Sequence, residues 1–95
     1  MTDTVAVVRA TRASANAVDA MGRHRGVYDR AMADHRRAYD RAMEAANYAA
    51  QNHALAQAAA YYTMANAAAI AWHRAKARYE RTQVALAANP LPGDC

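Results

Sequence analysis

The sequence predicts an all-α protein built around one very long, alanine-rich amphipathic helix, and three observations predict it. Alanine is the strongest helix former and contributes 29 of the 95 residues. No glycine or proline occurs between positions 27 and 89. The segment YDRAM occupies residues 28–32 and recurs eleven residues later, at residues 39–43.

The eleven-residue spacing continues along the chain and predicts which face of the helix is buried. Eleven residues make three helical turns of about 3.67 residues each, so positions eleven apart share a face. This periodicity predicts coiled-coil or helical-hairpin packing, and an isolated helix with such a face is expected to form oligomers. The side chains expected at the helix-packing or oligomer interface are Met21, Tyr28, Met32, His35, Tyr39, Met43, Tyr61, Ala65 and Trp72.

A shorter helix is expected to precede the long one, within a single domain that spans residues 1–95. Asp3 is a plausible N-cap for a helix that starts near Thr4 and ends near Met21, so this helix covers residues 3–21. Gly22 and Gly26 then predict a turn over residues 22–26. The alternative is one unbroken helix, since the apolar stripe continues through this segment with both glycines on its polar side.

The long helix is expected to cover residues 27–88. Asn89 and Pro90 end it, because proline disfavours helix in the residue before it, and residues 89–95 form a flexible tail. Residues 47–53 are rich in Asn and Gln and mark a second candidate bend. A bend there would convert the long helix into a hairpin with two arms.

Charge is mild and unevenly distributed. The net charge is +4, and residues 45–71 contain no Asp, Glu, Lys or Arg. This stretch is polar enough, with its Asn, Gln and His side chains, that a membrane span is not expected. Nucleic-acid binding is an alternative that is not favoured, because Asp29, Asp34 and Asp40 offset half of the nearby arginines. The candidate polyanion contacts are Arg23, Arg25, Arg30, Arg36, Arg37, Arg41, Arg74 and Arg78.

No catalytic, metal-binding or cofactor-binding arrangement is expected. His24 and His35 lie three turns apart, about 16 Å along a helix, so one chain cannot bring both to a single ion. The acidic and basic residues are spaced as solvated surface pairs four residues apart. Cys95 is the only cysteine, which excludes an internal disulfide.

These observations predict a non-enzymatic structural, self-association or adaptor protein that acts through a helical surface. Its expected partners are copies of itself or another helical protein, and no cofactor is implied. The alternatives are a basic helical protein that associates with nucleic acid, and a membrane-active helical protein. No signal peptide is visible, so a cytoplasmic location is expected. The Arg and Ala bias fits a small phage or accessory protein of a high-GC bacterium, in which case the protein could belong to a virion.

Overall fold

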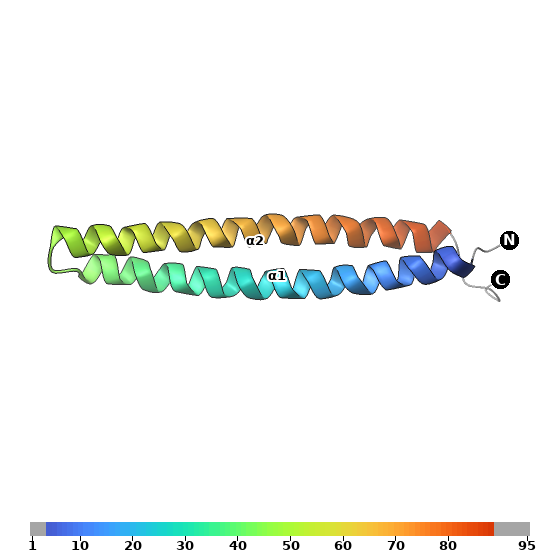
Figure 1. Cartoon of the computed structure of the whole chain (residues 1–95), viewed down its shortest axis with the longest axis horizontal. Coiled ribbons are helices and arrows are strands. Elements are labelled where there is room, and N and C mark those ends of the chain that lie inside the picture. The colour runs from blue at the N-terminus through green and yellow to red at the C-terminus, as the bar shows by residue number, and fades with distance from the viewer. Residues whose placement is uncertain (1–3, 89–95) are drawn as a thin grey trace. The chain divides into compact units, whose positions relative to one another are not determined.

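The computed structural model describes residues 4–88, and these form two α-helices joined by a short turn (Figure 1). Helix α1 spans Thr4–Glu44 and helix α2 spans Tyr48–Ala88, with 41 residues in each. The chain divides into two compact units: unit 1 contains residues 4–23 and 71–88, and unit 2 contains residues 24–70. In each unit α1 packs against α2, so the all-α prediction and its helical-hairpin alternative are confirmed.

Helix α1 is continuous through Gly22 and Gly26, so the turn predicted at residues 22–26 is wrong. Both glycines are exposed, and no atom lies within 4 Å of a Cβ added at either position. Each glycine costs a helix about 1 kcal/mol relative to alanine. That cost is small beside the packing of a helix that extends for many residues on either side, so the helix tolerates both glycines.

The single helix predicted over residues 27–88 is also wrong, because the chain turns at residues 45–47. At the end of helix α1 the Ala45 N–H donates to the Ala42 carbonyl at 3.3 Å, and this three-residue spacing closes a tighter turn than the four-residue spacing of the α-helix. Asn47 then caps α2: its Oδ1 accepts a hydrogen bond from the Ala50 N–H at 2.8 Å. Its carbonyl accepts from the Gln51 N–H at 3.0 Å and so begins the helical ladder.

The predicted bend at 47–53 coincides with the turn only at its first residue, and the rest of that segment is helical. Helix α2 continues to Ala88, the last described residue, and the predicted end of the helix at this position stays a prediction. The proposed Asp3 cap, the tail at 89–95 and Cys95 lie outside the described residues.

The core of each unit is made almost entirely of alanine. Ten of the eleven buried hydrophobic residues are alanines, and no polar or charged residue among residues 4–88 is buried. Small side chains at the contact let two helix axes approach closely. The buried residues of unit 1 are Val7, Ala17, Ala20 and Ala75; those of unit 2 are Ala31, Ala38, Ala42, Ala54, Ala58, Ala65 and Ala68.

The seam between the helices repeats every seven residues. In unit 2 the seam comprises positions 24, 28, 31, 35, 38 and 42 on α1, and 51, 54, 58, 61, 65 and 68 on α2, all of which are buried or half-buried. These positions advance by alternate steps of three and four, whereas the expected stripe repeated in elevens. Ala31 and Ala42 of the repeated segment are eleven residues apart, which is one seven-residue repeat plus a step of four, so both lie in the seam. The same shift moves the tyrosine of the segment from a seam position at Tyr28 to a position outside the seam at Tyr39. Tyr28 is half-buried, while Tyr39 is 48% exposed.

Candidate interaction surfaces

Four of the predicted interface residues, Tyr28, His35, Tyr61 and Ala65, occupy seam positions of unit 2, whereas Met32, Tyr39 and Met43 lie beside the seam. Of the nine, only Ala65 is fully buried, and Tyr39 and Met43 are exposed. The other six are half-buried: Met21, Tyr28, Met32, His35, Tyr61 and Trp72. The seam therefore leaves several of the largest side chains partly accessible on the sides of the hairpin.

In unit 2, the His35 side chain lies near two exposed tyrosines, Tyr39 and Tyr62, on one side of the hairpin. Its Nδ1–H donates to the Ala58 carbonyl of α2 at 2.9 Å, and the carbonyl requires that this nitrogen carry the proton. The His35 ring centroid lies 6.3 Å from that of Tyr39 on α1 and 5.5 Å from that of Tyr62 on α2. The imidazole is thus fixed at one end by the backbone and lies between two phenol rings from different helices.

More large apolar side chains extend this side of unit 2. Met32 lies seven residues before Tyr39, Met43 lies four after it, and Leu55 lies seven before Tyr62, so the helical repeat places each on the same side as its tyrosine. Met43 is 56% exposed, Tyr62 49% and Leu55 37%. Hereafter the tyrosine face denotes Met32, His35, Tyr39, Met43, Leu55 and Tyr62.

Sequence reasoning identified the four α1 residues of the tyrosine face and missed its two α2 residues. Leu55 and Tyr62 lie in the stretch without charged residues, where many small apolar side chains obscure any single stripe. Their seven-residue spacing, which matches the step between Met32 and Tyr39, was the signal that could have found them.

Several arginines of unit 2 have partners within the unit. Arg25 Nε forms an ion pair with Asp29 at 3.2 Å, and Arg37 forms one with Asp34. Arg41 donates to the side-chain oxygen of an α2 glutamine at 3.3 Å. Arg30 and Arg36, the remaining predicted polyanion contacts on α1 of this unit, are exposed. The five arginines of unit 2 are nearly balanced by four acidic residues, for a net charge of +1.

Unit 1 carries a much larger charge than unit 2. Its described residues include seven basic and two acidic side chains, for a net charge of +5. Among them, Lys76 Nζ lies 5.5 Å from the centroid of the Trp72 ring, and the Trp72 ring also meets His73 edge-on. The hairpin brings the arginines near both ends of the chain into one unit.

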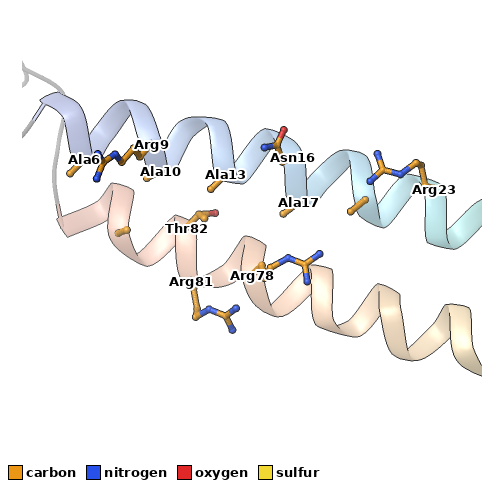
Figure 2. A pocket seen from close by; sticks show the side chains of 12 residues that line it. Ala6, Arg9, Ala10, Ala13, Asn16, Ala17, Arg23, Arg78, Arg81 and Thr82 are labelled. Carbon is orange, nitrogen blue, oxygen red and sulfur yellow. The ribbon is translucent and has the colours of Figure 1, made fainter.

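An open groove of about 780 Å³ lies between α1 and α2 of unit 1 (Figure 2). We call it the arginine groove, because Arg9, Arg23, Arg78 and Arg81 line it and no acidic residue does. Figure 2 shows Arg23 extending from α1 away from α2, and Arg81 from α2 away from α1. The other lining residues are Ala6, Ala10, Ala13, Asn16, Ala17, Ala20, Thr82 and Ala85.

Two of the four groove arginines, Arg23 and Arg78, were predicted as polyanion contacts, and Arg74 does not line the groove. Arg9 was missed because it lies far in sequence from the predicted contacts, whereas the position of Arg81 three residues after Arg78 was a signal that could have found it. Only the hairpin, which returns α2 to the start of α1, makes them neighbours.

Within residues 4–88, no helix is both long and apolar enough to cross a membrane. Across the same part of the chain, no three His, Cys, Asp or Glu side chains are grouped as a metal site requires. Comparisons with models of known protein families, with curated proteins and with solved structures found no match to this chain.

Proposed function

We propose that this protein is a non-enzymatic helical association protein, and that its tyrosine face joins two copies of the chain. The observation that carries the proposal is the accessible cluster of aromatic, methionine and leucine side chains on one side of unit 2. Large apolar patches are uncommon on the surfaces of monomeric soluble proteins, and where they occur they mark sites of interaction.

The small stabilisation that each seam alanine provides favours association of the hairpin with another chain. Burying one methyl or methylene group contributes about 0.8 kcal/mol, so each seam alanine adds little. Full burial of a Leu, Met or aromatic side chain contributes about 1.5–3 kcal/mol relative to leaving it exposed. Because Tyr39, Met43 and Tyr62 are each about half exposed, covering all three would add about 2–4 kcal/mol, comparable to the contribution of several seam alanines.

Charge favours a second copy as the occupant of the tyrosine face. Unit 2 has a net charge of only +1, so two such units repel each other weakly. The α2 side contributes no charged residue between positions 45 and 71, so covering it removes no charge from water. A two-fold arrangement would set the same patch against itself, with the tyrosine hydroxyl groups retaining hydrogen bonds at the rim.

The mass of the protein in solution tests this proposal. We expect sedimentation equilibrium to give twice the monomer mass of 10.3 kDa at micromolar concentration. Tyr62→Asp should weaken the dimer by roughly 100-fold or more, because each of two symmetric contacts would bury an unpaired carboxylate.

Ala60→Asp is the matched control. Ala60 is exposed on the same helix, two residues before Tyr62, and therefore points about 200° away from it. It carries the same charge change and should leave the dimer intact. A monomeric wild-type protein would contradict the proposal, and so would equal dissociation of the dimer by both substitutions.

A further inference from the structure

The arginine groove of unit 1 combines a small-residue floor with basic edges. Ala10 and Ala17 lie on the side of α1 that faces α2, together with Ala6 and Ala13 (Figure 2). Ala17 is buried, Ala10 is half-buried and Ala13 is exposed, so the floor deepens toward the seam. Such a floor accepts apolar side chains and offers little to a phosphate group.

The four groove arginines have no partner within the described part of the chain. None of Arg9, Arg23, Arg78 and Arg81 forms an ion pair or side-chain hydrogen bond among residues 4–88, in contrast to Arg25 and Arg37 of unit 2. All four are exposed. Each guanidinium can therefore receive a carboxylate in bidentate geometry without giving up an existing contact.

The length of the groove matches a short helix. From Ala6 to Ala20, α1 advances fourteen residues, or about 21 Å at 1.5 Å per residue. Arg9 and Arg23 are also fourteen residues apart, so they mark the two ends of the α1 edge, and Arg78 and Arg81 supply the α2 edge. A helix of about four turns would span this distance.

We propose that the arginine groove binds an acidic amphipathic helix of another protein, which completes a local three-helix arrangement. The apolar stripe of the partner would lie on the alanine floor, and glutamates or aspartates on both flanks of that stripe would meet the arginines. Charge complementarity decides between a helix and a second copy of this chain, because unit 1 carries +5 and would repel an identical unit. The apolar floor favours a helix over nucleic acid, whose phosphates would use the arginines alone.

The test uses the full chain and a fluorescent synthetic peptide of about 18 residues, long enough to form a helix on binding. The peptide carries Ala and Leu at helical spacing along one face and Glu on both flanks. A second peptide has the same composition with the apolar face scrambled, and a short DNA duplex is the third probe. Fluorescence anisotropy near physiological ionic strength gives a dissociation constant for each probe.

Two alanine substitutions separate docking in the groove from general attraction to a basic unit. Ala13→Glu places a carboxylate on the exposed part of the floor, whereas Ala15→Glu places it on another side of the same helix, outside the groove. Both substitutions lower the net charge of unit 1 by one. We expect Ala13→Glu to weaken binding of the amphipathic peptide on the order of tenfold or more, and Ala15→Glu to weaken it only slightly.

Arginine substitutions give a second, independent measurement. Arg9→Glu should weaken peptide binding strongly, while Arg12→Glu, which lies outside the groove on the same helix, should weaken it little. Circular dichroism establishes that each variant keeps its helix content.

Three results would overturn the proposal: equal loss for Ala13→Glu and Ala15→Glu, equal binding of the scrambled peptide, or tight binding of the DNA duplex with none of the peptide. The last result would instead assign the groove to nucleic acid. All of these outcomes are independent of Tyr62→Asp, which tests the tyrosine face in unit 2.

Discussion

Replacing Gly22 and Gly26 by alanine is expected to stabilise the hairpin, because both glycines lie in the interior of α1 and neither is required there. Both have open space around the position of an added Cβ, so a methyl group meets no atom within 4 Å. Neither has a backbone conformation that favours glycine. The substitution therefore changes helix propensity and almost nothing else.

The expected gain can be estimated from that geometry. Alanine is favoured over glycine by about 1 kcal/mol at an interior helix position, largely because glycine leaves the unfolded chain more freedom to lose. The added methyl groups gain no contact, so the double variant should be more stable by about 1–2 kcal/mol. For a domain of this size, each kcal/mol raises the melting temperature by about 4–8 °C, which gives a total rise of about 4–16 °C.

Thermal melting followed by circular dichroism measures this rise, with wild type and variant at one protein concentration, because association also shifts the melting temperature. Ala33→Gly is the reverse control: Ala33 is exposed in the same helix, and we expect its replacement to cost about 1 kcal/mol. A double variant that melts at or below the wild-type temperature would refute the reasoning. It would mean that residues 22–26 adopt a conformation that requires glycine, such as the turn predicted there from the sequence.

Two further substitutions test the seam and the turn. Ala38→Leu should destabilise the protein by about 1–3 kcal/mol, because Ala38 has no exposed surface and the seam has no room for a larger side chain. Ala33→Leu, at an exposed position, should be nearly neutral in the same urea titration, and equal effects would contradict the assignment of the seam. Asn47→Ala should cost about 1 kcal/mol by removing the cap bond to Ala50, with Asn52→Ala as the control. Hydrogen exchange should show faster opening of the first turn of α2, and unchanged exchange there would argue against the cap.

The helical class of the protein could be predicted from the sequence, but the position of the turn could not. Glycine is the usual marker of a helix break, and it pointed to Gly22 and Gly26. The chain instead turns at residues 45–47, which include neither glycine nor proline. The local signal there is Asn47, whose capping bond is worth only about 1 kcal/mol. The position of the turn depends on how α1 and α2 pair along their whole length. This pairing cannot be read from the residues near the turn alone.

The identity of the buried face could be predicted only in part. Large side chains at helical spacing indicated a stripe that includes Tyr39 and Met43, and both are exposed. With 29 alanines available, the sequence also contains a stripe in which alanines recur among larger side chains, and close helix packing buries those alanines. The two stripes overlap, so periodicity alone could not show which of them faces the partner helix. The arginine groove was beyond sequence reasoning for a different reason, since its residues come from both ends of the chain.

The alanine seam also restricts how this protein can change during evolution. A position such as Ala38 or Ala65, with no exposed surface, can accept glycine or serine at a cost but no larger residue without moving the helices apart. The exposed side chains of the tyrosine face and the arginine groove carry no such restriction. Single substitutions at the exposed positions of either surface can therefore accumulate during evolution while the two helices stay packed. A lineage that keeps the seam could exchange one partner for another through a series of intermediates that are all stable.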